Sequence, residues 1–167
     1  MIFAMTGTEV HPFPRFTRAI DELHRAGGLG EEVFLQLGNS PEEPRHVPFE
    51  RFLSFGEVVE RVRAASVVVT HAGAGSTLVC LQQGKHPVVV PRLHRLGEMI
   101  DDHQVPFAAR MAAAGLVTLV EDVAGLAAAI AAARARTGPA AAVGRRGELT
   151  AWLEGFWRER AGRAARP

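Results

Sequence analysis

The segment VVVTHAGAGST (residues 67–77) combines residue types that often bind a phosphate group. An apolar β-branched run leads into a polar and glycine-rich stretch that contains His71, Gly73, Gly75, Ser76 and Thr77. Glycine lets the backbone approach a phosphate closely, and the free amides and dipole at a helix start stabilise negative charge. We expect Ser76 to cap this helix, with its hydroxyl able to turn to a phosphate oxygen. The pattern predicts an anion site; the alternative is a tight turn before a capped helix, with no ligand.

Two common nucleotide-binding motifs do not fit this loop. The dinucleotide fingerprint GxGxxG needs a third glycine, and the chain has Leu78 there. A P-loop needs a lysine, and the loop has none. These departures disfavour a Rossmann-type oxidoreductase, so we expect neither a nicotinamide nor a flavin cofactor.

Two other positions are expected to lie near the loop. The turn Thr6-Gly7-Thr8 also ends an apolar run and can present backbone amides and hydroxyls at the same edge. His71 stands at the end of its own predicted strand, where an imidazole can donate a hydrogen bond to a phosphate. A purely structural role for His71 is the alternative.

A second polar cluster, DDHQ at residues 101–104, has side chains that suit the recognition of sugar hydroxyls. Acidic residues are also favoured in the first turn of a helix, and Asp101 fits that role better. We expect Asp102, His103 and Gln104 to face a sugar. Adjacent residues of a helix do not face one ion together, so Asp102 and His103 do not predict a metal site.

These residues need a framework that brings several strand ends together. Apolar runs predict strands at residues 2–5, 33–37, 67–69, 87–90 and 116–120, with a further one near 51–53. Helices are predicted at residues 14–25, 56–65, 77–83, 101–114, 123–136 and 149–160. Strands that alternate with helices indicate an α/β fold with a doubly wound, mostly parallel, Rossmann-like sheet. In such sheets ligands bind beyond the carboxyl ends of the strands, where the glycine loop must lie.

The composition fits one folded domain. The chain has 167 residues, 47% of them hydrophobic and 22% charged, with a net charge of +1. We expect a single domain over residues 1–160 and a frayed tail over residues 161–167. The balanced charge excludes a global attraction to nucleic acid. Cys80 lies in an apolar run and is expected to be a buried thiol. The sequence shows neither a basic leader nor an apolar stretch of about 20 residues, so we expect a cytoplasmic protein.

In these segments the sequence resembles the C-terminal, donor-binding half of GT-B glycosyltransferases of family 28. It is most similar to the small stand-alone subunits of two-component bacterial exopolysaccharide transferases, which are related to the catalytic subunit of the eukaryotic N-acetylglucosaminyltransferase that makes lipid-linked chitobiose. Three stretches carry the resemblance, which extends to about Asp122: MIFAMTGT followed by PFPRF, then VVVTHAGAGSTLVCLQQGKHPVVVPR, and GEMIDDHQVPFAARM. The resemblance implies one domain that corresponds to the C-terminal half of a GT-B fold.

The resemblance also implies roles for particular residues. The diphosphate of a UDP-sugar would be held by Gly7, Thr8, His71, Gly73, Gly75, Ser76 and Thr77, and the donor sugar would face Asp102, His103 and Gln104. Many relatives have a glutamate that grips the ribose where this chain has Val79. The exopolysaccharide subunits read GTHEQ after the first strand, whereas this chain reads GTEVH. Glu9 and His11 are therefore shifted, and no catalytic base is assigned.

The implied function is that of an inverting hexosyltransferase for exopolysaccharide biosynthesis that needs no metal or other cofactor. A membrane-anchored, acceptor-binding subunit would complete the heteromeric complex and recruit this chain to the inner face of the membrane, where the acceptor is lipid-linked or a glycan. A homo-oligomer is a further expectation. The apolar positions of the last predicted helix could dock on the partner or pack on this chain's own sheet: Leu149, Trp152, Leu153, Phe156 and Trp157. A non-catalytic regulatory or scaffold subunit is the alternative, which Val79 favours.

Overall fold

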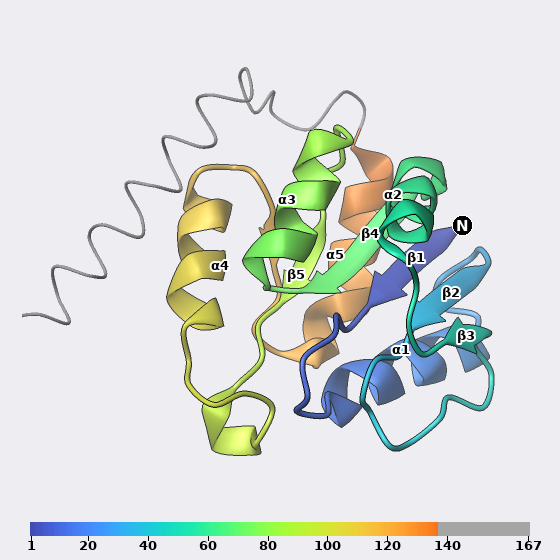
Figure 1. The fold of residues 1–167 in the computed structure, drawn as a ribbon. Coiled ribbons are helices and arrows are strands. Elements are labelled where there is room, and N and C mark those ends of the chain that lie inside the picture. The colour runs from blue at the N-terminus through green and yellow to red at the C-terminus, as the bar shows by residue number, and fades with distance from the viewer. Residues whose placement is uncertain (137–167) are drawn as a thin grey trace, which may run out of the picture.

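Six parallel strands form one open sheet in the computed structural model, which describes residues 1–136 (Figure 1). The strands are β1 (Ile2–Met5), β2 (Val33–Gln36), β3 (Phe49–Glu50), β4 (Val67–His71), β5 (Val88–Val90) and β6 (Thr118–Leu119). Their order across the sheet is β3-β2-β1-β4-β5-β6, and each neighbouring pair is parallel. The order reverses between β1 and β4, which makes this the switch point where ligands bind in open α/β sheets.

Helices cover both faces of the sheet (Figure 1). On one face lie α1 (Pro14–Arg25) and α5 (Leu126–Ala135), and on the other lie α2 (Phe55–Ala64), α3 (Ala74–Gln82) and α4 (Gln104–Ala113). Two 3-10 turns, η1 (His94–Leu96) and η2 (Val123–Gly125), complete the described elements. This architecture confirms the predicted doubly wound parallel fold.

The sheet is buried from both sides because alternate residues of each strand point to opposite faces. In β1, Ile2 and Ala4 join the core that contains α1 and α5, whereas Phe3 and Met5 join the core beneath α2 and α3. This explains why β4 begins with three consecutive valines. Cys80 is also fully buried, as predicted, and burial raises the pKa of its thiol to about 12.

Some element boundaries differ from the predictions. The short edge strand lies at Phe49–Glu50 instead of near residues 51–53, because Phe49 and Glu50 pair with Leu35 and Gln36 of β2. Helix α4 begins at Gln104, so residues 101–103 precede it. The 3-10 turn η2 occupies the start of the helix that was predicted from residue 123. The predicted last helix and tail, residues 149–167, lie outside the described residues.

The prediction that Ser76 caps the glycine-loop helix is wrong. Helix α3 begins at Ala74, its N-cap is Gly73, and Ser76 is the third residue inside the helix. The helix starts earlier because Thr77 N–H already bonds to the carbonyl of Gly73 at 3.0 Å. The Ser76 side chain is therefore not needed as a cap and has a different partner, described below.

Candidate functional site

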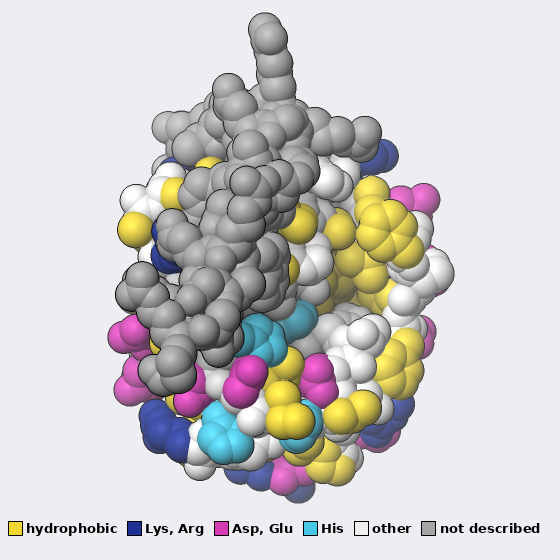
Figure 2. All heavy atoms as spheres, turned by 60° about the vertical axis from the view of Figure 1, so that its left-hand side comes forward, with side chains coloured by type: hydrophobic (Ala, Val, Ile, Leu, Met, Phe, Trp, Pro, Cys, Tyr) yellow, Lys and Arg dark blue, Asp and Glu magenta, His cyan; other side chains and the backbone are white. Residues whose placement is uncertain are grey.

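The loops that leave β1 and β4 border a cleft of about 590 Å³ at the carboxyl edge of the sheet. One side of the cleft, the histidine wall, consists of Gly7, His71, Gly73, Ser76 and Gln104. The other side, the apolar wall, consists of Leu53, Phe55, Val58 and Val79. Figure 2 shows a hollow with hydrophobic side chains along one side and histidine side chains at its border. The cleft therefore offers one polar and one apolar surface to the same ligand.

The imidazole of His71 is packed between the two glycine turns. A Cβ on Gly7 would lie 2.4 Å from His71 Nε2, and a Cβ on Gly73 would lie 2.1 Å from His71 Cε1. Gly7 also has a positive φ of 79°, a conformation that favours glycine. At Gly73 the backbone is ordinary, with φ −74°, so only the close approach of the ring demands glycine there. Both positions therefore require glycine so that the His71 ring fits between the two turns.

A chain of buried hydrogen bonds orients His71. The backbone N–H of Arg92 donates to Gln104 Oε1 at 3.1 Å, which turns the Gln104 Nε2 amide toward His71 Nδ1 at 3.5 Å. With Nδ1 as the acceptor, the proton of the neutral ring resides on Nε2, 3.1 Å from Ser76 Oγ. Ser76 Oγ accepts a hydrogen bond from this Nε2–H, so its own hydroxyl proton is free to donate into the cleft.

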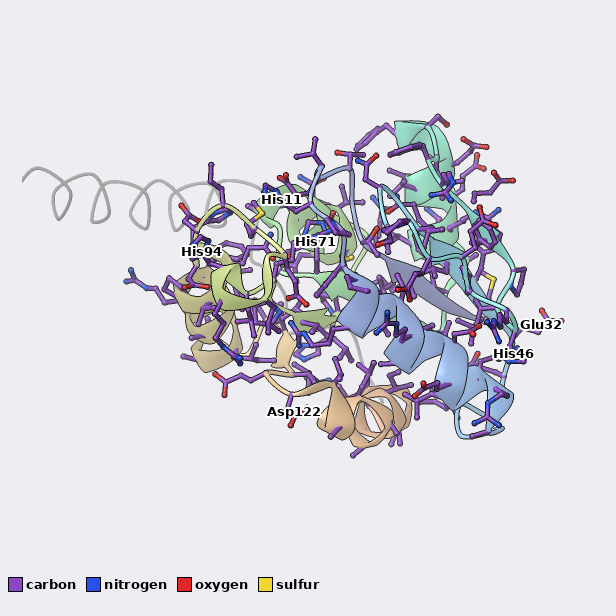
Figure 3. All side chains as sticks on the ribbon, turned by 90° about the horizontal axis from the view of Figure 1, so that it is seen from below. His11, Glu32, His46, His71, His94 and Asp122 are labelled. Atoms are coloured by element: carbon purple, nitrogen blue, oxygen red, sulfur yellow. The ribbon has the colours of Figure 1, made fainter. Side chains whose placement is uncertain are left out.

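His71 is neutral at physiological pH. Burial, together with the smaller effect of the nearby positive charge of Arg92, lowers the pKa of its imidazole to about 3. Glu9 acts in the opposite direction but does not outweigh burial. His71 therefore acts in the site as a fixed hydrogen-bond donor and not as a cation. Figure 3 labels it together with His11 and His94, all at the end of the molecule away from Glu32, which precedes β2.

Arg92 ties together the loops around the cleft. Its side chain is 1% exposed, and its guanidinium donates to the carbonyls of Thr6, His11, Pro12 and Glu98 at 2.9 to 3.2 Å. The group also lies 4.6 Å from the centre of the Phe13 ring. Burial lowers the pKa of Arg92 to about 10, so the group stays charged at neutral pH. A fixed positive charge thus lies beneath the histidine wall.

The start of α3 has free donors. No side chain caps this end of the helix, and the first backbone bond into it comes from Thr77 N–H. The amides of Ala74, Gly75 and Ser76 are thus the helix-start donors that have no partner in the helix. A Cβ on Gly75 would meet nothing within 4 Å. Since glycine within a helix costs roughly 0.5–1 kcal/mol relative to alanine, the fold itself gives no reason for glycine at this position.

The structure brings most of the predicted site residues together. The cleft is lined by Gly7, Thr8, His71, Gly73, Gly75, Ser76, His103 and Gln104. Thr77 is not among the lining residues; its side chain is fully buried and its hydroxyl has no partner. Asp102 also does not line the cleft, because its carboxylate accepts the backbone N–H of His94 at 2.8 Å. His103 lines the cleft while its Nδ1 pairs with Asp101.

Of the four residues of the apolar wall, the sequence analysis considered only Val79. Leu53 and Phe55 flank Ser54, which begins α2 with a capping box to Glu57. This box fixes where the chain turns into α2 and so where both side chains lie. Phe55 is 71% exposed, which is unusual for so large an apolar residue. One feature of the sequence could have indicated this wall: Phe55 is an aromatic residue that directly follows the helix cap Ser54.

Glu9 also lines the cleft. Its carboxylate accepts from His11 Nδ1 at 3.0 Å and from the Val10 backbone N–H at 2.9 Å. The hydrogen bond from His11 holds the pKa of Glu9 below its usual value. Within residues 1–136, no three potential metal ligands gather into a metal site. In the same part of the chain, no helix is both long and apolar enough to cross a lipid bilayer.

Comparisons with known proteins agree with this geometry. The family described as glycosyltransferase family 28 C-terminal domain matches residues 1–142. The fold is similar to that of the glycotransferase of kitacinnamycin, with a TM-score of 0.57 and 21% identity over 81% of this chain and 35% of that one. The glycosyltransferase SnogD from Streptomyces nogalater gives a TM-score of 0.47 and 17% identity, over 80% of this chain and 38% of that one. The chain thus spans little more than a third of the length of these proteins. No curated protein matches it in sequence.

Proposed function

Because this chain belongs to the family of glycosyltransferase family 28 C-terminal domains, we propose that its cleft binds the nucleotide-sugar donor of a glycosyl transfer. The observation that carries the proposal is the start of α3, where uncapped amides and the open side of Gly75 lie beside the Ser76 hydroxyl. These groups suit a diphosphate, since they donate hydrogen bonds at the positive end of a helix dipole. Arg92 adds a buried positive charge behind them.

The two walls suggest how the donor lies. The diphosphate would rest on the histidine wall, and the nucleoside would extend over the apolar wall, where the exposed ring of Phe55 can stack on a base. The sugar would then point toward His103 and Gln104, which line the same cleft. A UDP-sugar is the donor that the resemblance implies.

The proposed chemistry is an inverting transfer, in which an acceptor hydroxyl attacks the anomeric carbon as the bond to the diphosphate breaks. Negative charge grows on the leaving diphosphate, and the α3 amides and the Ser76 hydroxyl would stabilise it through hydrogen bonds, while neutral His71 would orient that hydroxyl. Preorganised donors of this kind contribute on the order of 3 kcal/mol each at a developing anion. We therefore propose that the transfer needs no metal. The base that takes the acceptor proton would come from the partner.

The partner follows from the same proposal. This chain spans about a third of the length of the glycosyltransferases it resembles in fold, which leaves the acceptor side to another polypeptide region. We propose a membrane-anchored subunit that binds a lipid-linked or glycan acceptor for polysaccharide synthesis and brings this chain to the membrane. Co-expression with such a subunit, followed by a screen of donors for sugar transfer, tests this part directly.

Calorimetric titration of the chain with UDP- and dTDP-linked sugars tests donor binding. We expect saturable binding, and a purely scaffolding subunit would show none. Ser76→Ala should weaken affinity about tenfold, because a hydrogen bond to a charged group contributes about 1.5–3 kcal/mol. Thr77→Val is the matched control at the next residue, and it should leave affinity unchanged because the Thr77 hydroxyl is buried without a partner. Equal affinity in the wild type and in Ser76→Ala would contradict the assignment of the diphosphate site to the start of α3.

A further inference from the structure

Val79 lies one helical turn beyond the proposed diphosphate site. Gly75 and Val79 are four residues apart on α3, so they lie on the same face of the helix, about 6 Å apart along its axis. Both line the cleft. Val79 packs in one cluster with Leu53 and Val58, so it connects the phosphate-binding end of α3 with the apolar wall.

The covalent order of a nucleoside diphosphate fixes what meets Val79. The pentose stands between the diphosphate and the base. If the diphosphate rests on the start of α3 and the base lies against Phe55 and Leu53, the pentose must cross the helix face at Val79. This step uses only the order of the ligand's parts and the order of the residues along the cleft.

Among the described residues that line the cleft near Val79, no side chain is suited to a pair of ribose hydroxyls. Its neighbours Leu53 and Val58 are apolar. The amide of Gln36 lines the cleft but is already committed, because it donates to the carbonyls of Gly7 and Arg51 and accepts from Gly7 N–H at 2.8 to 2.9 Å. Among the described lining residues, Glu9 has the one carboxylate, and it is held by His11 and the Val10 amide in the loop after β1.

From this arrangement we infer that the cleft selects a donor built on a 2′-deoxyribonucleoside diphosphate in preference to a ribonucleoside diphosphate. A 2′-hydroxyl turned toward Val79 would lose its water without gaining a partner, whereas the 2′-methylene of a deoxyribose would make apolar contact with the valine. The inference rests on the proposed function, since it concerns the nucleoside of the same donor, and it replaces the UDP-sugar implied by the resemblance with a deoxynucleotide sugar.

The test is a calorimetric titration of the full chain with four nucleotides that differ at two positions: UDP, dUDP, 5-methyl-UDP and dTDP. We expect dUDP to bind about tenfold more tightly than UDP, a difference of about 1.4 kcal/mol. The same ratio is expected between dTDP and 5-methyl-UDP, because the effect resides in the pentose. The four ligands thereby separate the effect of the methyl group on the base from the effect of the missing 2′-hydroxyl.

Substitution of Val79 provides the second arm. Val79→Glu should reverse the preference, so that UDP binds more tightly than dUDP, because a carboxylate accepts hydrogen bonds from ribose hydroxyls. Val79→Thr has nearly the shape of valine and keeps the experiment decisive if the glutamate variant does not fold; it should reduce the dUDP preference at least threefold. Val79→Ile is the apolar control and should keep it.

The outcomes separate the two proposals. If UDP binds to the wild type as tightly as dUDP, or more tightly, the inference about the deoxyribose is overturned while the proposed donor site stands. If the dUDP preference is present but unchanged in Val79→Thr, Val79 is not its cause and the inference is also overturned. If none of the four nucleotides binds saturably, the proposed function fails together with the inference.

Discussion

The two sides of the cleft are built in different ways. The histidine wall is made of backbone turns and buried side chains: His71 is 9% exposed and Gln104 is 2% exposed, and each is held by hydrogen bonds to other buried groups. The apolar wall is made of side chains that are half-buried or, at Phe55, 71% exposed. The first wall is therefore part of what holds the fold together, whereas in the second the exposed Phe55 can change with little cost in stability. In the proposed donor site the diphosphate lies on the fixed wall and the nucleoside meets the more exposed wall.

The largest effect on stability is expected when a methyl group is placed inside the histidine wall. Gly73→Ala puts a Cβ 2.1 Å from the buried His71 ring, so the ring must move and its hydrogen bonds must break. We expect the free energy of unfolding to fall by about 3 kcal/mol, the upper range for overpacking a core. Denaturant titration followed by circular dichroism measures the change.

Gly75→Ala is the matched control, because a Cβ there meets nothing within 4 Å. Its stability should be unchanged or raised by up to about 1 kcal/mol, through the better helix propensity of alanine. Its nucleotide affinity should nevertheless fall, since the new methyl group stands where the diphosphate would approach the backbone. Equal loss of stability in the two variants would contradict the view that only Gly73 is packed against His71.

A smaller effect is expected when the pH is lowered from 7 to 5. The pKa of His71 is lowered to about 3 in the folded chain from an ordinary value of about 6.5, so between these values the unfolded chain binds a proton that the folded chain does not. The contribution of His71 to the free energy of unfolding is therefore fully present above pH 6.5. As the pH drops below this value, the contribution falls by up to about 1.4 kcal/mol per pH unit.

Nuclear magnetic resonance checks the pH prediction directly. The His71 ring signals should not shift between pH 7 and pH 5, and the free energy of unfolding should decline across the same interval. Burial also lowers the pKa of His86, so part of the decline comes from that residue. A His71 titration midpoint above pH 5 would show that the histidine wall is open to water.

The smallest effect on stability is expected on the apolar wall. Phe55→Ser removes a ring that is 71% exposed, so the free energy of unfolding should change by no more than about 0.5 kcal/mol. Affinity for a nucleoside diphosphate should fall, because the base loses its stacking surface, while affinity for inorganic diphosphate should not. If the two ligands lose affinity equally, the apolar wall does not hold the nucleoside.

Local patterns were enough to predict the framework. The valine run at residues 67–69 predicted a strand, and the alternation of strands and helices predicted the doubly wound sheet that the structure confirms. The family was also identified from three short stretches and confirmed over residues 1–142. The roles of the individual site residues remain predictions, although eight of the ten line one cleft. These features depend on residues close together in sequence, where hydrophobic period and turn residues act directly.

Other features required the tertiary structure, because they depend on contacts between distant segments. Gly7 and Gly73 are 66 positions apart in the sequence, yet both are needed for the same imidazole, and no local pattern links them. Folding buries Arg92 against carbonyls of the loop after β1, and nothing in its local sequence indicates this. Asp102 is directed to the His94 amide by the turn that precedes α4. The sequence by itself determined the sheet, the family and the position of the glycine loop; only the packing of one loop against another decided which glycines contact His71 and that Val79 connects the two walls.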